Sequence, residues 1–304
     1  MSERIHYEYC PACGSPDFNN VLHVKDHTVS GETFTIAECL SCTLRFTQDV
    51  PPATAIGPYY KSDDYISHSD TGKGIINRLY HWVRKRTITR KRKLVQSITD
   101  KKTGNLLDVG SGTGAFVSEM KKHQWQAVGL EPDEGARSMA KQLYQVELSD
   151  VSEFYHLPAA HFDAITLWHV LEHVHDLDSY IQQLRSLLNE KGRIFIAVPN
   201  YTSHDATVYR EFWAAYDVPR HLYHFSPKSM QMLMSKHGLN ILQYLPMWYD
   251  SIYISLMSSR YRNSEHAQKG NTNWVSATFT GTRSNFNALR DKTRCSSIIY
   301  VIGK

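Results

Sequence analysis

The chain has 304 residues, of which 41% are hydrophobic, and its formal net charge is +4 at pH 7. This length accommodates one α/β domain of about 200 residues with smaller additions, and the mild positive charge implies no obligatory polyanionic partner. Because no apolar run reaches about 18 residues, we expect no transmembrane helix. The N-terminal segment lacks the apolar region of a secretory signal, so we expect a cytoplasmic protein.

Four of the five cysteines form two C-x2-C pairs near the N-terminus: Cys10, Cys13, Cys39 and Cys42. In a reducing compartment this pattern is typical of a tetrahedral structural zinc site. The residues between the pairs alternate as short strands within VLHVKD and ETFTIAEC, which predicts a hairpin. We therefore expect a zinc-ribbon-like module over residues 1–48, with a redox dithiol or a disulfide pair as the alternative.

Residues 49–98 are predicted to form a linker and a basic lid helix. Tyr65 and His68 in the linker could close over a bound cofactor, although linker aromatics as often only pack. Apolar residues recur at helical spacing over 75–98, and the basic side chains of this helix are not interrupted by acids. The helix could make peripheral contact with an anionic membrane or with nucleic acid, or it could present a solvated basic face.

A glycine-rich turn, LLDVGSGTG, follows an apolar run that ends in Asp108 and opens a helix. Gly110, Gly112 and Gly114 can adopt positive φ angles and leave room for a ligand. A second apolar run ends in Glu131, where a carboxylate can accept hydrogen bonds from both ribose hydroxyls. This pattern predicts a nucleoside-binding crevice.

The loop distinguishes two cofactors. A dinucleotide fingerprint, G-x-G-x-x-G, places pyrophosphate at a helix N-terminus. Here the third glycine follows the second after one residue and not after two. Asp108, two positions before the first glycine, would repel a phosphate but suits a cation. S-adenosylmethionine carries an ammonium and a sulfonium and no phosphate. The chain resembles the class I S-adenosylmethionine-dependent methyltransferases, whose first motif is an acidic residue followed by G-x-G-x-G.

This resemblance implies an α/β, Rossmann-like, seven-stranded sheet over residues 99–304, with a substrate-side insertion over 201–225. We predict strands at 105–109, 126–130, 145–148, 162–168, 193–198 and 239–244, and an antiparallel last strand at 296–302. Ser226 and Pro227 predict the start of a helix. By the resemblance, the cofactor-binding residues are Asp108, Gly110, Ser111, Gly112, Gly114, Glu131, Pro132, Asp150, Val151 and His169.

The segment WHVLEHV contains His169, Glu172 and His173 in the H-x-x-E-H order of inverzincin proteases. That interpretation requires the motif inside a helix, whereas here it directly follows a predicted strand. We therefore expect His169 to line the cofactor site, and Glu172 and His173 to stabilise the start of the next helix.

The end of the insertion, DVPRHLYHF, together with the cysteine module resembles the sugar C-methyltransferases. In those enzymes the comparable run carries a tyrosine, a glutamate and a histidine that acts as general base. His221 matches that histidine, whereas Val218 and Arg220 stand in place of the other two. Arg220 could instead bind an anionic substrate group, and His221 could be purely structural. Three further substrate-side candidates are Tyr223, His224 and Asp250.

The sequence therefore predicts methyl transfer from S-adenosylmethionine to a small-molecule, sugar, glycan-linked or lipid-linked acceptor. A nucleic-acid methyltransferase is an alternative suggested by the cysteine module and the basic helix, but no N-P-P-Y-type motif follows the fourth strand. A non-catalytic protein that binds S-adenosylmethionine is another alternative. The sequence does not specify the acceptor or the oligomeric state.

Overall fold

The computed structural model describes residues 4–61, 75–248, 250–265 and 274–304, with only the backbone over 75–85. The chain forms two compact units. Unit 1 comprises residues 1–68, 171–178 and 197–300, and unit 2 comprises residues 69–170, 179–196 and 301–304. The cysteine pairs and the predicted insertion thus belong to unit 1, whereas the glycine loop belongs to unit 2.

Three parallel strands organise unit 2. Strand β4 (Asn105–Val109) pairs in parallel with β5 (Gln126–Leu130) on one side and with β6 (Phe162–Trp168) on the other. Because parallel strands end at the same edge, the loops after all three meet there, and ligands of such sheets bind at this edge. The glycine loop, Glu131 and His169 follow these three strand ends, as the sequence predicts.

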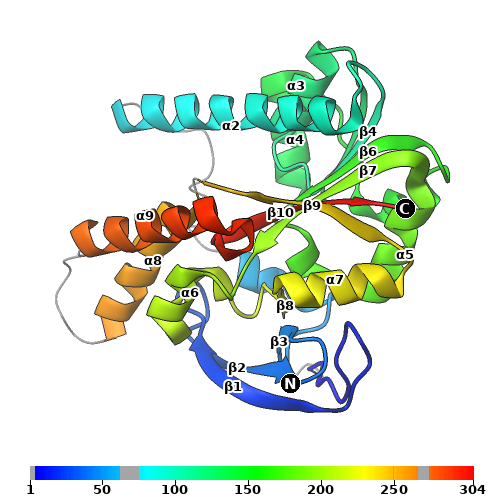
Figure 1. Ribbon diagram of the computed structural model, residues 1–304. Coiled ribbons are helices and arrows are strands. Elements are labelled where there is room, and N and C mark those ends of the chain that lie inside the picture. Colours follow the sequence, from blue (N-terminus) through cyan, green and yellow to red (C-terminus); the bar gives the residue numbers. More distant parts are fainter. Residues whose placement is uncertain (1–3, 62–74, 249, 266–273) are drawn as a thin grey trace. The chain divides into compact units, whose positions relative to one another are not determined.

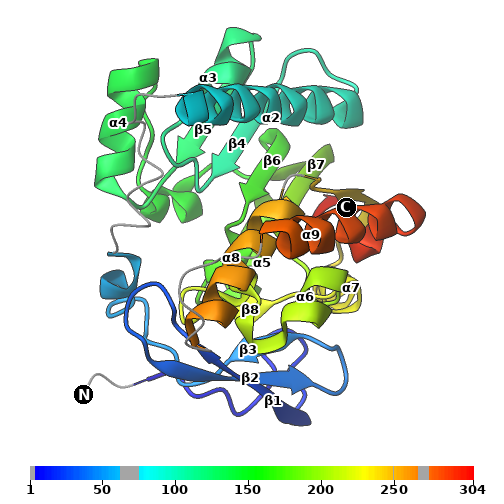
Figure 2. The same cartoon turned by 90° about the vertical axis from the view of Figure 1, so that its left-hand side faces the viewer.

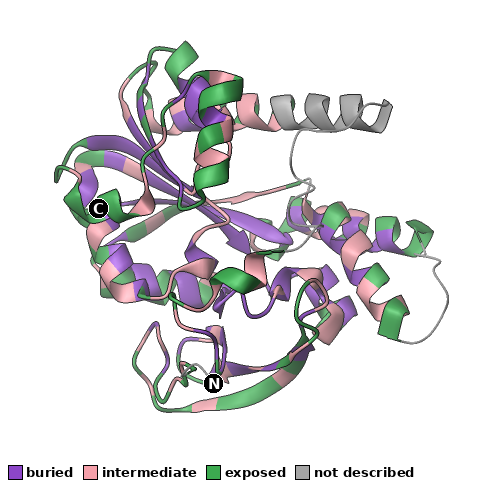
Figure 3. Ribbon diagram, turned by 180° about the vertical axis from the view of Figure 1, so that it is seen from behind, coloured by how far each residue is buried: buried purple, intermediate pink, exposed green. Residues whose placement is uncertain are grey.

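Helices cover these strands. Helix α2 (Ile75–Thr99) packs against α3 (Ala115–Lys122), and α3 packs in turn against β5 and against α4 (Glu134–Tyr144) (Figure 2). Strand β6 is buried along nearly its whole length, and the central strands are purple in Figure 3. Burial on both faces explains why five of its seven residues are apolar, and the two polar ones, Asp163 and Thr166, are hydrogen-bonded. The predicted basic helix is confirmed by α2.

In the part of the chain that the structure describes, one sheet has six strands in the order β5-β4-β6-β7-β10-β9. Its remaining members are β7 (Leu188–Pro199), β9 (Asn240–Pro246) and β10 (Ser297–Gly303). The α/β sheet architecture is therefore confirmed, with one strand fewer than the predicted seven.

The predicted strand at 145–148 is wrong. Gln145 adopts a left-handed conformation, with φ +55°, and caps the C-terminus of α4. Only a single bridge, between Leu130 and Ser149, joins this segment to the edge strand β5. The left-handed cap turns the chain away from the extended path that a strand would need.

Unit 1 contains a second, antiparallel sheet with the order β1-β2-β3-β8 (Figure 1). Strands β1 (Phe18–Lys25) and β2 (Thr33–Cys39) confirm the predicted hairpin between the cysteine pairs. Strand β3 (Arg45–Thr47) follows the second pair and hydrogen-bonds to β8 (Tyr223–His224), which lies within the predicted insertion. The N-terminal module and the end of the insertion thus form one sheet, so the compact units do not follow the predicted succession of segments.

The other helices of the chain are short or peripheral. They are α5 (Leu177–Leu187), α6 (His204–Tyr209), α7 (Pro227–Lys236), α8 (Asp250–Glu265) and α9 (Trp274–Arg290), with short 3-10 turns at Gly57–Tyr60, Val151–His156, Leu171–His173, Arg210–Phe212, Ala214–Tyr216 and Lys292–Arg294. The predicted start of α7 is confirmed, since Ser226 and Ser229 form a capping box. Among the described helices, none is both long and apolar enough to cross a bilayer.

A buried carboxylate ties the insertion to the C-terminal part of unit 1. Asp205 is fully buried in α6 and accepts hydrogen bonds from Trp213 Nε1 at 2.8 Å, Ser284 Oγ at 2.7 Å and Ser296 Oγ at 2.6 Å. These donors come from the segment after α6, from α9 and from the residue before β10. One side chain therefore satisfies three buried donors on three separate segments.

We expect Asp205→Ala to lower the free energy of unfolding by about 3 kcal/mol or more, because it leaves three buried donors without an acceptor. Urea denaturation would measure this change. Asp291→Ala is the matched control, since Asp291 caps an exposed 3-10 turn through Thr293 and should cost about 1 kcal/mol or less. Equal midpoints for the two variants would contradict the bracing role of Asp205.

Candidate functional site

The glycine loop of unit 2 has the conformation that its sequence predicts. Gly110, Gly112 and Gly114 have φ angles of +69°, +53° and +74°. A Cβ atom on Gly110 would collide with the side chain of Val170, whereas a Cβ on Gly112 would meet no atom within 4 Å. Gly110 therefore allows close packing of the loop against the segment after β6, and Gly112 lies beside open space where a ligand can approach.

Glu131 closes this loop. Its Oε2 accepts a hydrogen bond from the Gly112 amide at 2.7 Å, and its Oε1 accepts one from the Asp133 amide at 3.1 Å. The Glu131 side chain is mostly buried, and this burial raises its pKa. The loop amide that a phosphate would otherwise use is thus already bound to a carboxylate.

Asp108 lies at the end of β4 with only 1% of its surface exposed. Thr166 on β6 donates a hydrogen bond from Oγ1 to Asp108 Oδ1 at 2.6 Å, and Ser111 Oγ donates to the Asp108 carbonyl at 2.8 Å. Burial raises the pKa of Asp108 to about 6, although the positive charge of Lys91 opposes this shift. The Lys91 ammonium lies 4.2 Å from the centre of the Trp168 ring. A basic residue of α2 thus provides positive charge near this carboxylate.

Arg137 is a residue of this region that the sequence analysis missed. Its Nη1 donates to the carbonyls of Glu131 and Pro132 at 2.6 and 2.8 Å, and to Asp150 Oδ2 at 2.8 Å. Asp150 also accepts a hydrogen bond from the Ser152 amide and so caps the 3-10 turn that Val151 begins. The sequence could have indicated this role, because Arg137 lies in the first turn of α4, just after the N-cap Asp133 and close to Glu131.

The other predicted cofactor-side residues are placed as follows. His169 follows β6 directly and has a φ of +59°, a left-handed conformation that is uncommon for a residue other than glycine. Tyr65 and His68 lie outside the described residues. The structure thus brings the glycine loop, both carboxylates and His169 to one edge of the parallel strands.

These residues fit S-adenosylmethionine better than a dinucleotide. The buried carboxylates of Asp108 and Glu131 lie at the ends of the adjacent strands β4 and β5. The Gly112 amide already donates a hydrogen bond to Glu131. Carboxylates attract the ammonium and accept hydrogen bonds from ribose hydroxyls, whereas they repel a pyrophosphate. The loop, Asp108 and Glu131 would hold the donor, with the loop at its methionine part and Glu131 at its ribose.

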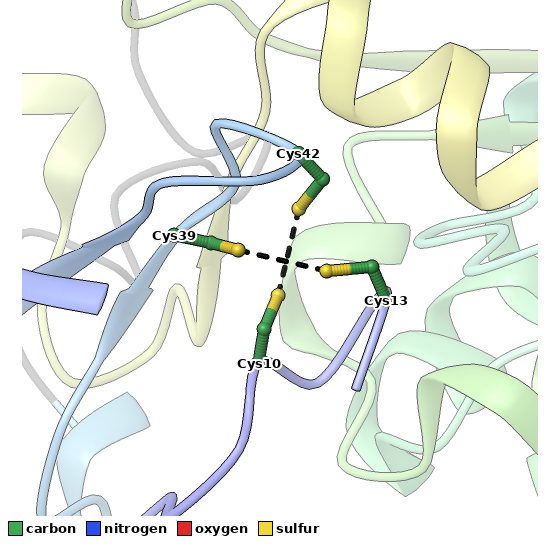
Figure 4. A group of neighbouring side chains, drawn as sticks. All are labelled: Cys10, Cys13, Cys39 and Cys42. Atoms are coloured by element: carbon green, nitrogen blue, oxygen red, sulfur yellow. Dashed lines mark hydrogen bonds between the residues drawn. The ribbon is translucent and has the colours of Figure 1, made fainter. Parts of the chain in front are cut away.

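The four paired cysteines of unit 1 converge on one point (Figure 4). Cys10 Sγ lies 3.5 Å from Cys42 Sγ, and Cys13 Sγ lies 3.5 Å from Cys39 Sγ. All four sulfurs lie within 4.8 Å of one another, and none of these cysteines forms a disulfide. A tetrahedral zinc–thiolate site with bonds of about 2.3 Å requires sulfur separations of roughly 3.8 Å. The arrangement therefore fits a zinc ion.

The two cysteine pairs form equivalent turns. In each pair the residue after the second cysteine has a positive φ, +74° at Gly14 and +62° at Thr43. The amide of this residue donates a hydrogen bond to the carbonyl of the first cysteine of its pair, at 2.8 Å from Gly14 to Cys10 and at 2.9 Å from Thr43 to Cys39. The Leu44 amide also points at Cys42 Sγ, at 3.4 Å. Such paired turns aim two thiolates at a common centre.

Unit 1 also brings Glu172, His173 and His221 together. One potential ligand atom from each lies within 4.8 Å of the other two, and the two imidazole rings meet edge to face with centroids 4.7 Å apart. Both Nδ1 atoms face backbone carbonyls at 2.9 Å, that of Arg220 for His173 and that of Ala215 for His221. Because a carbonyl only accepts, each Nδ1 carries a hydrogen, and the neutral ring has its lone pair on Nε2.

This cluster corrects the expectation for WHVLEHV. Glu172 and His173 lie in the 3-10 turn Leu171–His173 and not at the start of α5, which begins at Leu177. The Glu172 carbonyl accepts a hydrogen bond from the Leu222 amide at 2.8 Å, so this turn holds the end of the insertion. The motif does not lie within an α-helix, so the inverzincin pattern is not met.

Arg220 is not available to a substrate, contrary to our expectation. It is 2% exposed and donates to Asp26 at 3.0 Å, to Asp217 at 2.6 Å and to the Tyr59 carbonyl at 2.9 Å. Asp26 is itself 1% exposed. Arg220 therefore neutralises a buried carboxylate inside unit 1, and the lone arginine in the sequence gave no sign of the distant Asp26.

Two more substrate-side candidates are buried with internal partners. Tyr223 donates to the His175 carbonyl at 3.1 Å, and His224 Nε2 lies 3.1 Å from Thr47 Oγ1. Burial lowers the pKa of His224 well below its usual range, so this ring is neutral. Asp250 is the half-buried first residue of α8. Of the predicted substrate-side set, only His221 and Asp250 retain some exposure.

Comparison with known proteins agrees with this geometry. Residues 81–244 match the family model of a methyltransferase domain. An uncharacterised methyltransferase of Alkaliphilus oremlandii is 31% identical over 130 residues, which cover 41% of this chain and 60% of that protein. The ubiquinone biosynthesis O-methyltransferase of Histophilus somni is 36% identical over 116 residues, covering 34% of this chain and 48% of that protein.

The matched region thus spans about half to three fifths of the length of these relatives. Among solved structures, a SAM-dependent methyltransferase from Archaeoglobus fulgidus is 16% identical, with a TM-score of 0.46 over 73% of this chain and 94% of that one. The family model covers more than half of this sequence, from within α2 to within β9. The chain therefore belongs to the methyltransferase-domain family.

Proposed function

We propose that the protein transfers a methyl group from S-adenosylmethionine to a small-molecule acceptor, a sugar or a glycan- or lipid-linked intermediate, on oxygen or carbon. The observation that carries this proposal is the hydrogen bond from the Gly112 amide to Glu131 Oε2 at 2.7 Å. It fills the phosphate position of the loop with a carboxylate and leaves a site suited to a cationic, hydroxyl-bearing donor. Membership of the methyltransferase-domain family supports the same activity.

S-adenosylmethionine, when bound, supplies an electrophilic methyl group and a neutral thioether leaving group. The protein must then bind and orient the two reactants, exclude water and accept a proton from the acceptor where one is lost. Asp108, the loop and Glu131 perform the first task in unit 2. The negative charge of these carboxylates attracts the donor's ammonium group.

His221 is our candidate for the proton acceptor, on its local chemistry in unit 1. The Ala215 carbonyl fixes its Nδ1 hydrogen, which leaves the Nε2 lone pair to accept a proton. Asp217 Oδ2 lies 3.9 Å from Nε2 and would stabilise the imidazolium that results. The neighbouring His173 stays neutral, because burial lowers its pKa to about 4, and so does not repel that charge.

We further propose that Cys10, Cys13, Cys39 and Cys42 hold a structural zinc ion. Four thiolates complete a tetrahedral shell and leave no open position for a substrate. The role is therefore to fix the turns that flank β1, β2 and β3.

The first prediction concerns Asp108→Asn. Because the pKa of Asp108 is raised, the folded state holds a proton on this carboxyl between about pH 4 and 6, where the unfolded chain has lost it. The free energy of unfolding therefore falls as the pH rises through this window, and above it the charged carboxylate destabilises the fold. The asparagine should raise the free energy of unfolding at pH 7.5 by on the order of 3 kcal/mol and weaken S-adenosylmethionine binding at least tenfold. Thermal melts and isothermal titration measure the two effects.

Asp163→Asn is the matched control, because Asp163 lies near the start of β6, at the opposite end of the parallel strands from Asp108. Asp163 accepts hydrogen bonds from Lys101 Nζ and from the Asn105 amide. It should lower stability and leave the affinity for S-adenosylmethionine unchanged. Unchanged affinity in Asp108→Asn would remove Asp108 from the donor site.

A second prediction separates binding from proton transfer. His221→Gln should preserve S-adenosylmethionine affinity and lower turnover by about 10²-fold to 10⁴-fold, the usual contribution of a general base. Turnover can be followed with any accepted substrate as release of S-adenosylhomocysteine. His237→Gln is the control, since His237 is a buried histidine paired with Asp178. Wild-type turnover in the His221 variant would leave that histidine a structural role only.

A third prediction tests the metal. The purified chain should contain one zinc ion per molecule by elemental analysis, and Cys42→Ser should lose the metal and lower the melting temperature. Cys295→Ala should keep the metal, because Cys295 is buried away from the cluster and directed at the Met247 carbonyl. A metal-free protein whose four thiols are oxidised would instead favour the disulfide alternative.

A further inference from the structure

Unit 1 contains a groove that none of the roles above uses. Its volume is about 390 Å³, within the usual range of small-molecule sites. The residues that line it are Leu22, Arg45, Tyr201, Thr202, Ala206, Thr207, Arg210, Tyr216 and Arg294. They come from β1, β3, the segment after β7, the insertion and the turn before β10. Three are arginines, and none of these described lining residues is acidic.

Arg45 is fixed at one side of the groove. Its guanidinium lies 4.1 Å from the centre of the Tyr201 ring, and its Nη1 donates to Tyr216 Oη at 2.7 Å. Its Nε donates to Glu38 at 2.7 Å, so part of its charge is neutralised. An arginine held by a ring, a hydroxyl and a carboxylate loses little freedom when it binds a ligand.

The other two arginines have unused donors. The Arg294 side chain is 60% exposed, and its contacts are long, 4.0 Å to Asp291 and 3.5 Å to the Thr202 carbonyl. Arg210 is exposed, and its guanidinium has no hydrogen bond or ion pair with any residue that the structure describes. Two exposed guanidinium groups of the groove therefore keep donors for a ligand, with the Asp291 carboxylate at 4.0 Å from Arg294 Nε as a weak competitor.

Two hydroxyl groups of the groove already donate their hydrogens to backbone carbonyls. Tyr201 donates to the Thr43 carbonyl at 2.6 Å, and Thr207 donates to the Ser203 carbonyl at 3.0 Å. Their protons are therefore used inside the protein, and the arginines, together with the Tyr216 hydroxyl that accepts from Arg45, are the groups left to bind an anion.

Arg220 provides the contrast. It lines a pocket of only about 10 Å³, hardly enough for one water molecule, together with the carboxylates of Asp26 and Asp217. There a single arginine is enclosed and neutralised. In the groove, three arginines line a ligand-sized space and no described lining residue is acidic, although Glu38 pairs with Arg45 from outside the lining.

We propose that this groove binds the phosphate group of a small molecule, a phosphomonoester or a diphosphate. Planar guanidinium groups bind phosphate oxygens in pairs, and several arginines around one space are the usual way to hold a dianion. The volume admits a phosphate together with part of the group that it carries. This proposal does not depend on methyl transfer, since it concerns only residues of unit 1.

Isothermal titration of the full-length protein at low and at high salt tests the proposal. The probes are inorganic pyrophosphate, UDP-glucose and uncharged glucose. Arg210→Gln and Arg294→Gln, singly and together, remove the free donors. Arg290→Gln is the control, because Arg290 is an exposed arginine at the end of α9 outside the groove. Titration with S-adenosylmethionine in parallel reports on the donor site alone.

We expect pyrophosphate and UDP-glucose to bind with salt-sensitive affinity, and glucose not to bind. Each single variant should weaken binding about tenfold and the double variant about a hundredfold, in line with charge-assisted hydrogen bonds. Tighter binding of UDP-glucose would identify a nucleotide-linked ligand, and equal binding would identify the phosphate group alone. If neither anion binds, or if the double variant binds them like the Arg290 control, the proposal is overturned, whatever the result with S-adenosylmethionine.

Discussion

The hydrogen bond between Glu131 and the Gly112 amide occupies the loop amide that a phosphate would otherwise use. Strands β4 and β5 pair in parallel, so their two loops leave the sheet at adjacent points. A glycine loop at such a point ordinarily offers its amides to phosphate. Here the carboxylate of Glu131, in the neighbouring loop, accepts a hydrogen bond from that amide. The second buried carboxylate, Asp108, lies near the end of the adjacent strand β4. Burial of both acids gives the edge a preference for cations and hydroxyl donors before any ligand arrives.

Unit 1 uses its charged residues in the opposite way. Arg220, Asp26 and Asp217 neutralise one another inside the unit, and His173 and His224 are kept neutral by burial. The arginine groove, in contrast, has the exposed guanidinium groups of Arg210 and Arg294 along its lining. The two buried carboxylates at the strand edge thus belong to unit 2, and the arginine groove belongs to unit 1.

The features that were predictable from sequence are those set by neighbouring residues. The glycine loop and the Ser226 cap each depend on a few consecutive side chains, and both have the expected local form. Features set by distant partners were not predictable. Arg220 meets a carboxylate almost two hundred residues away, and β3 finds its partner β8 across a similar distance. The failed strand at 145–148 shows the same limit, since the left-handed cap at Gln145 overrides its apolar pattern.

The cysteine module is connected to the candidate base through a short series of contacts in unit 1. Thr43 follows Cys42, its Oγ1 lies 2.8 Å from Ser226 Oγ, and its carbonyl accepts from Tyr201. Two residues after Arg45 in the same strand, Thr47 donates to the His221 carbonyl at 2.8 Å. The turn that presents two of the thiolates therefore also holds the wall of the groove, and the strand it leads into holds the backbone of His221. A metal that fixes this turn would therefore also stabilise the position of Tyr201 and the backbone around His221.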